Sequence, residues 1–144
     1  MQLYNCAGIF VHSKDTMKKS KYIYYLDVEN EDLYFFKHAI EGLGHKISIY
    51  RDGHKMMQDL SKSETKPDIL FLGSNMPILQ GKELIMILKN SKELNHIPVI
   101  IITSALPRKL MKSYADAGIK HIMKRTHPED YSVAFKEVLE MKFA

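Results

Sequence analysis

The sequence predicts an α/β fold in which helices cover both faces of a parallel sheet. Short apolar runs alternate along the chain with segments whose apolar residues recur every three or four positions. The runs lack the in-out alternation of a half-exposed sheet, which is typical of strands buried on both faces. The length of 144 residues and the hydrophobic fraction of 45% suit one domain that fills one core.

The first half of the chain supplies two strands and two helices. Residues 22–26, YIYYL, form a continuous β-favouring run that predicts the first strand. A helix with one apolar face, or stripe, is predicted next, and it ends at Gly44, a residue type that commonly terminates helices. The members of this stripe are Leu33, Phe36, Ile40 and Leu43. Residues 47–50 predict a shorter second strand. The second helix is marked by Met56, Met57 and Leu60.

The middle of the chain adds two more strands, and each is followed by a helix. Residues 69–72 and 98–103 are short apolar runs, and the second is rich in β-branched residues. The helix after Gly81 has an apolar stripe of Leu84, Ile87 and Leu88. Pro107 suits the first turn of the next helix, and Gly118 ends it. The inward residues of that helix are predicted to be Leu110, Tyr114 and Ala117.

The last strand and helix complete the pattern. Residues 119–123 predict the fifth strand, and Thr126 to Glu129 predict a capping box at the start of the fifth helix. The stripe of that helix is Tyr131, Ala134, Phe135 and Val138. Five strands that are each followed by a helix imply right-handed crossover connections and parallel strands. The prediction is a flavodoxin-like (βα)5 three-layer sandwich with strand order 2-1-3-4-5, whose site lies beyond the carboxyl ends of the first and third strands.

The segment 67–81, PDILFLGSNMPILQG, resembles the part of response-regulator receiver domains that reads PDLILLDLNMPGMDG. The resemblance spans about residues 21–141, in several segments that agree in order and spacing. In that family an aspartate at the head of this loop accepts a phosphoryl group, and Gly73 stands at that position here. A phosphoryl ester requires a nucleophilic oxygen, which glycine lacks. The resemblance therefore implies a degenerate receiver.

Other positions of the receiver pocket can be assigned by the same resemblance. Asp27 matches the first of two adjacent acidic residues that help to hold Mg²⁺ in the family, and Val28 stands at the second. The carbonyl group of Asn75 would face the same pocket. Thr103 resembles the switch hydroxyl, and Lys124 resembles the phosphate-binding lysine. The resemblance implies no catalytic residue and no enzymatic activity of the chain's own.

Weak or absent Mg²⁺ binding is expected, and no other metal or cofactor. Mg²⁺ requires an octahedral shell of oxygens with compensating carboxylates, and the family's pocket supplies three where Asp27 remains here. Asp68 does not replace the missing group, because five residues at about 3.3 Å each place it about 16 Å from Gly73. Asp27 and Lys124 either pair across the space at Gly73 or remain two solvated charges.

Two further positions depart from the family pattern. His121 stands at the aromatic switch position, where it is either pH-sensitive or simply exposed. Arg125 follows Lys124 where the family usually has proline in a cis bond. Since a cis bond before a residue other than proline costs about 2.5–4 kcal/mol, we expect a trans bond and an altered loop.

The net charge of +4 is concentrated near the N-terminus, where residues 1–21 carry a surplus of three. We therefore divide the chain into a basic N-terminal extension, 1–21, and a receiver-like domain, 22–144. A solvated tail is a simpler interpretation than a nucleic-acid arm. No apolar run approaches the roughly 20 residues of a membrane span. The single cysteine, Cys6, excludes an internal disulfide and fits the cytoplasm.

The leading hypothesis is a stand-alone pseudo-receiver of bacterial two-component (phosphorelay) signalling. It would act as a phosphorylation-independent protein-interaction module, with a histidine kinase or another signalling protein as its partner. Family receivers signal through the fourth helix, fifth strand and fifth helix, a face that could also form a homodimer. Residues that could contribute there are Met111, Lys112, Lys120, Arg125 and His127. Two alternatives stay open: an anion or nucleotide site at the switch point, and phosphorylation on an unusual residue.

Overall fold

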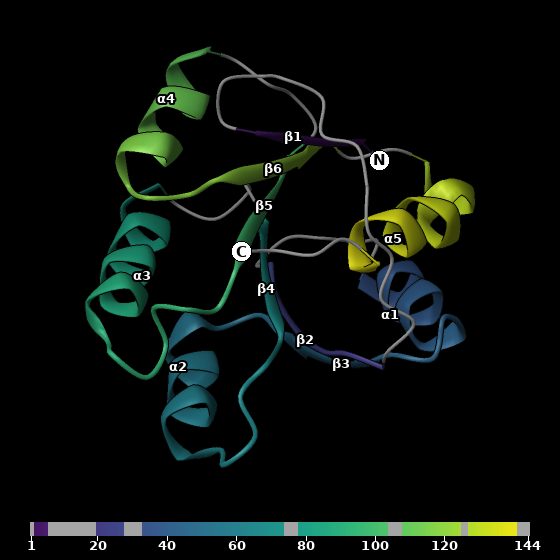
Figure 1. The fold of residues 1–144 in the computed structure, drawn as a ribbon, viewed down its shortest axis with the longest axis horizontal. Helices are drawn as coiled ribbons and strands as arrows, with labels where there is room; N and C mark the ends of the chain where they lie inside the picture. The colour runs from purple at the N-terminus through teal and green to yellow at the C-terminus, as the bar shows by residue number, and fades with distance from the viewer. Residues whose placement is uncertain are drawn as a thin grey trace.

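The computed structural model describes residues 2–5, 20–27, 33–73, 78–103, 108–124 and 127–140. Six strands form one sheet in the order β1-β6-β5-β4-β2-β3. The strands are β1 (Gln2–Asn5), β2 (Tyr22–Leu26), β3 (Lys46–Tyr50), β4 (Ile69–Gly73), β5 (Val99–Thr103) and β6 (His121–Lys124). Strands β2 to β6 pair in parallel, which confirms the predicted order 2-1-3-4-5 for the five strands of the receiver-like domain (Figure 1).

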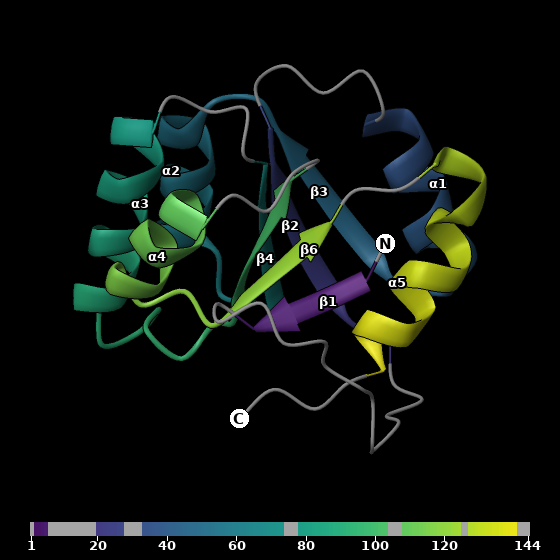
Figure 2. The same ribbon diagram turned by 90° about the horizontal axis from the view of Figure 1, so that it is seen from above.

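Helices cover both faces of this sheet and complete three layers. They are α1 (Leu33–Gly42), α2 (Gly53–Lys62), α3 (Ile78–Asn90), α4 (Arg108–Asp116) and α5 (Tyr131–Leu139). Helices α1 and α5 lie on one face, and α2, α3 and α4 lie on the other (Figure 2). None of the helices in the described ranges is long and apolar enough to cross a membrane.

Each face of the sheet has its own hydrophobic core, so the single core expected from the sequence is in fact two. One core joins the sheet to α2, α3 and α4, and the other joins it to α1 and α5. In the second core the ring of Phe36 stacks on Tyr131 at a centroid distance of 4.3 Å and meets Phe135 edge-on at 5.1 Å. The continuous apolar runs of the strands follow from this double burial.

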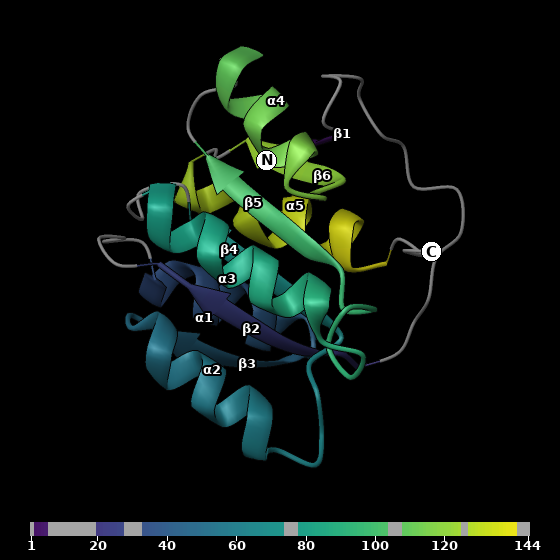
Figure 3. The same cartoon turned by 90° about the vertical axis from the view of Figure 1, so that its left-hand side faces the viewer.

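Strand β1 was not predicted. Its four residues pair antiparallel with β6, in a register that sets Gln2 opposite Lys124 and Asn5 opposite His121. Figure 3 shows β1 beside β6, at the margin of the sheet beneath α4. Part of the segment that the sequence assigned to a basic extension therefore belongs to the sheet. The uncharged strand QLYN does not carry the basic surplus of that segment.

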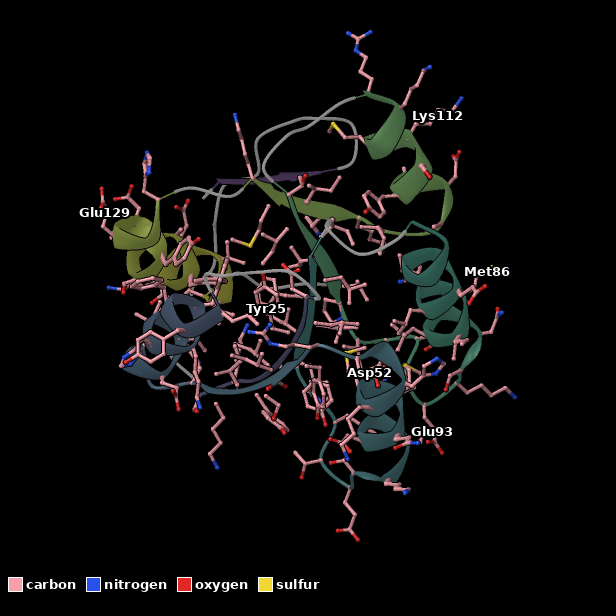
Figure 4. All side chains as sticks on the ribbon, turned by 180° about the vertical axis from the view of Figure 1, so that it is seen from behind. Tyr25, Asp52, Met86, Glu93, Lys112 and Glu129 are labelled. Carbon is pink, nitrogen blue, oxygen red and sulfur yellow. The ribbon has the colours of Figure 1, made fainter. Side chains whose placement is uncertain are left out.

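The predicted inward stripe of the third helix was wrong at one residue. Leu84 and Leu88 are buried, but Ile87 is 54% exposed and Ile85 is buried in its place. The local sequence LIMIL is apolar around the whole helix, so its spacing does not define one inward face. Met86, which is also exposed, points away from the sheet (Figure 4).

Two boundaries near the C-terminus also differ from the prediction. β6 begins at His121, because the N–H of Ile119 donates to the carbonyl oxygen of Tyr114 (2.9 Å) and closes the end of α4. The predicted capping box is not the start of α5. Glu129 lies in a 3-10 turn, Pro128–Asp130, and the helix begins at Tyr131 without a side-chain cap, whereas Thr126 lies outside the described residues.

Candidate functional site

The sheet register brings four predicted site residues to one edge. Leu26 lies opposite Leu72, so Asp27 neighbours Gly73 at the ends of β2 and β4. Gly73 lies opposite Ile102, and the next residue, Thr103, lies opposite Lys124. The order across the edge is therefore Asp27, Gly73, Thr103 and Lys124. This is the carboxyl edge at the switch point, where the sequence placed the site.

Asp27 fills the space that the absence of a side chain at Gly73 leaves open. A Cβ atom built on Gly73 would overlap the Oδ2 and Cγ atoms of Asp27 and would lie 2.9 Å from its Cβ. Real Cβ atoms do not approach other atoms so closely. The carboxylate at the end of β2 and a side chain at the end of β4 therefore exclude each other in this arrangement.

The carboxylate of Asp27 is fixed inside the molecule. The side chain is fully buried, and the hydroxyl of Tyr25 donates a hydrogen bond to Oδ2 (3.2 Å). Residues 25 and 27 are two apart on one strand, so their side chains share a face. The backbone N–H of Asp27 donates to the carbonyl oxygen of Tyr50 (3.1 Å), which holds this strand end against β3.

Tyr25 is the partner of Asp27 that the sequence analysis missed. Its ring is fully buried and packs against Phe36 at a centroid distance of 4.9 Å and Phe71 at 6.4 Å, in the interior shown in Figure 4. The run YIYYL indicated only a buried strand. The sequence does place a tyrosine two residues before an aspartate. Because buried tyrosine hydroxyls usually find a hydrogen-bond partner, this spacing could have indicated the Tyr25–Asp27 bond.

The remaining described site residues differ in exposure. Thr103 is buried at the end of β5, whereas the side chain of Lys124 is exposed at the end of β6. The ion pair between Asp27 and Lys124 stays a prediction, and the structure gives Asp27 a hydrogen bond from Tyr25. Val28, Asn75 and Arg125 lie outside the described residues, so their predicted roles and the trans bond are not placed.

The Mg²⁺ ion that the resemblance implies does not fit this set of residues. Of the four site residues that the register groups at this edge, Asp27 is the one carboxylate, and it is buried and bonded to Tyr25. Position 28 is valine, and position 73 has no side chain. Mg²⁺ binds through carboxylates and waters in near-octahedral geometry, and the described site residues supply a single, buried carboxylate. Within the described ranges, no group of three or more His, Cys, Asp and Glu could hold a metal ion.

Two other polar residues lie away from the carboxyl edge. Asp68 accepts a hydrogen bond from the N–H of Tyr22 (2.8 Å), at the start of β2, so it lies at the opposite end of the sheet from Gly73, as predicted. His121 is half-buried at the amino end of β6. Burial and the charge of Lys120 lower the pKa of His121, which favours a neutral imidazole at pH 7.

Comparisons with known proteins agree with the fold. The family model described as response regulator receiver domain matches residues 28–135. The polar-differentiation response regulator DivK of Brucella anthropi is 34% identical over 77 residues, which cover 53% of this chain and 61% of DivK. The two-component response regulator ORR7 of Oryza sativa subsp. indica is 28% identical over 94 residues, 65% of this chain and 46% of ORR7. The chain thus spans less than two thirds of both relatives.

Solved structures show the same architecture at low sequence identity. The phosphorylated cyanobacterial phytochrome response regulator RcpA has a TM-score of 0.70 at 19% identity, and the match covers 85% of this chain and 92% of RcpA. The chemotaxis response regulator CheY4 of Vibrio cholerae has a TM-score of 0.69 at 16% identity and covers 83% of this chain and 99% of CheY4. These similarities support the fold.

Proposed function

Because the chain belongs to the response regulator receiver family, we propose that it is a pseudo-receiver, a two-component signalling module that acts without phosphorylation. The observation that carries this proposal is the exclusion between Asp27 and any side chain at position 73. The chain has no carboxylate where the family presents its phosphoacceptor, and a neighbouring carboxylate occupies the space.

The chemistry of phosphoryl transfer supports the proposal. Attack on a phosphodonor requires an accessible oxygen in line with the leaving group, together with metal ions that neutralise charge. Gly73 offers no oxygen, and Asp27 is inside the protein and accepts a hydrogen bond from Tyr25. The Tyr25–Asp27 contact would keep the pocket in one arrangement, which suits a module whose surface is read constitutively and which is not itself an enzyme.

The proposed partner is a histidine kinase or another signalling protein of the cytoplasm. The proposed contact face comprises α4, β6 and α5, where Lys112, Lys120 and His127 are exposed and Met111 is buried. Strand β1 lies along β6, so this face includes residues that the family pattern does not supply. The same face is the proposed surface for a homodimer.

The phosphorylation test uses acetyl phosphate with Mg²⁺ and intact mass spectrometry after an acid quench. The wild type is expected to remain unmodified. The double variant Gly73→Asp with Val28→Asp restores a nucleophile and a second acid, and its new side chain at position 73 must displace the carboxylate of Asp27. This folded variant is the positive control and is expected to gain some phosphoryl mass. Phosphoryl transfer to the wild type would contradict the proposal, and its loss in Asp27→Asn would identify Asp27 as an unusual acceptor.

The interaction test places a photoreactive amino acid at position 112 on α4. The control is position 55 on α2, because both lysines are exposed and they lie on different helices. Cross-links to a signalling protein or to a second copy are expected from position 112 and not from position 55. Equal cross-linking from both positions would contradict the assignment of the contact face.

A further inference from the structure

A cavity lies at the opposite edge of the sheet from the candidate site. Its volume is about 200 Å³, and it opens beside the amino ends of β5 and β6. The apolar part of its wall comes from residues 97–99. The polar side chains that line it are Lys89, Asn95, His96, Lys120 and His121. They come from three segments: the end of α3, the connection to β5, and the start of β6.

The position of Lys89 depends on a glycine. A Cβ atom built on Gly118 would lie 3.4 Å from Cε of Lys89 and 3.8 Å from its Cδ and Cγ, so the lysine stem crosses directly over the glycine. Gly118 has φ +94°, a conformation that favours glycine. The end of α4 thus leaves room for the apolar stem of Lys89, which lines the cavity.

The lining of the cavity has one sign of charge. Two lysines, two histidines and an asparagine contribute donor groups, and the described lining contains no carboxylate. Glu93 and Asp116, on neighbouring segments, are exposed and do not line it. Burial and the charge of Lys120 lower the pKa of His121, so the positive charge of the lining comes from the two lysines. Two lysines in a lining whose described residues include no carboxylate raise the local concentration of anions.

We propose that this cavity binds a compact oxyanion, with a phosphoryl group as the best match. Phosphate is held by charge-assisted hydrogen bonds from lysine, and the cavity presents two lysines from different segments. Sites for drug-sized ligands measure roughly 300–1,000 Å³, so a cavity of about 200 Å³ is too small for a nucleotide. The phosphoryl group belongs either to free phosphate or to a small metabolite. This site is independent of Gly73 and of the proposed pseudo-receiver function.

The binding test titrates inorganic phosphate into the ¹⁵N-labelled chain at constant ionic strength, with chloride as the reference anion. Saturable amide shifts in residues 95–97 and 118–121 are expected with phosphate and not with chloride. Lys120→Gln and Lys89→Gln should each weaken binding about tenfold, because a charge-assisted hydrogen bond is lost. Lys112→Gln is the matched control, since it removes the same charge from the outer face of α4 (Figure 4).

Glycerol phosphate distinguishes the two sources of the phosphoryl group. Tighter binding than that of inorganic phosphate assigns the site to a phosphorylated metabolite, and equal or weaker binding assigns it to free phosphate. Shifts that are linear in concentration, equal with chloride, or weakened as much by Lys112→Gln as by Lys120→Gln would overturn the proposal. Each variant is first compared with the wild type by its amide spectrum, and Lys89→Gln replaces Lys120→Gln if the latter is misfolded.

Discussion

Adding a single methyl group at position 73 should destabilise the protein through its contact with Asp27. Gly73 is not among the described glycines with positive φ, so its backbone conformation is open to alanine. At such a position a glycine-to-alanine change ordinarily stabilises a protein by about 0.4–1 kcal/mol, because it restricts the unfolded chain. Any destabilisation by Gly73→Ala therefore reports what the new methyl group meets in the folded state.

The magnitude follows from the atoms that the methyl group would overlap. It would displace the carboxylate of Asp27, which is fully buried, and overpacking of this kind costs about 1–3 kcal/mol. The displaced carboxylate would also lose its hydrogen bond from Tyr25, and bonds to charged groups contribute about 1.5–3 kcal/mol. Because the Asp27 side chain can partly relax, we take the lower end of each range; after subtraction of the unfolded-state gain, the expected net loss is about 2 kcal/mol. At roughly 3–5 °C per kcal/mol, Tm falls by about 6–10 °C.

The assay is a double-mutant cycle in urea with Asp27→Gly as the second change. This variant removes all three Asp27 atoms that the methyl group would meet. In its background Gly73→Ala should be neutral or mildly stabilising, so the two changes should couple by about 2 kcal/mol. If Gly73→Ala costs the same in both backgrounds, or stabilises the wild type, Asp27 does not occupy the space beside Gly73.

Three further outcomes are expected. Burial and the charge of Lys21 lower the folded-state pKa of His45, whose Nδ1 accepts a hydrogen bond from the N–H of Lys21 (2.9 Å). The stability that neutral His45 provides is present above about pH 6.5 and is lost as the pH falls through the folded-state pKa. In urea unfolding, His45→Asn should therefore lose less stability on acidification than the wild type does. An equal loss in both proteins would refute this account. Millimolar Mg²⁺ should leave Tm almost unchanged in a thermal shift assay, since binding with a Kd well below about 1 mM would raise it visibly. Deletion of residues 1–5 should lower Tm but keep the five parallel strands, with faster amide exchange in β6. An intact exchange pattern would mean that β1 does not pair there.

The fold was predictable because local and global signals agree in most of the chain. Continuous apolar runs gave the parallel strands, and the glycines at 44 and 118 ended helices where the backbone has positive φ. Strand β1 was not predictable, because four residues carry little periodicity and their pairing with β6 is a tertiary contact. The inward face of α3 was ambiguous because Ile85 and Ile87 are equally apolar and differ only in their position around the helix.

The sequence predicted which residues lie together at the site, but not how their side chains are oriented. Parallel strands carry the residues after them to one edge, so Asp27, Gly73 and Thr103 could be grouped from the sequence. The sequence also indicated empty space at Gly73, where the structure has the carboxylate of Asp27. That difference depends on the orientation of one buried side chain, which a pattern of residue types does not specify. The spacing of Tyr25 and Asp27 indicates that their bond is possible but not where it holds the carboxylate.

The pairing of β1 with β6 also sets an order for the assembly of the sheet during synthesis. Gln2 emerges from the ribosome early, but its partner Lys124 emerges only when nearly all of the domain has been made. Contacts between such distant residues form slowly, because a long loop must close first. Of the six strands in this sheet, β1 is therefore made first and joins last, and the outer edge of β6 stays open until it does.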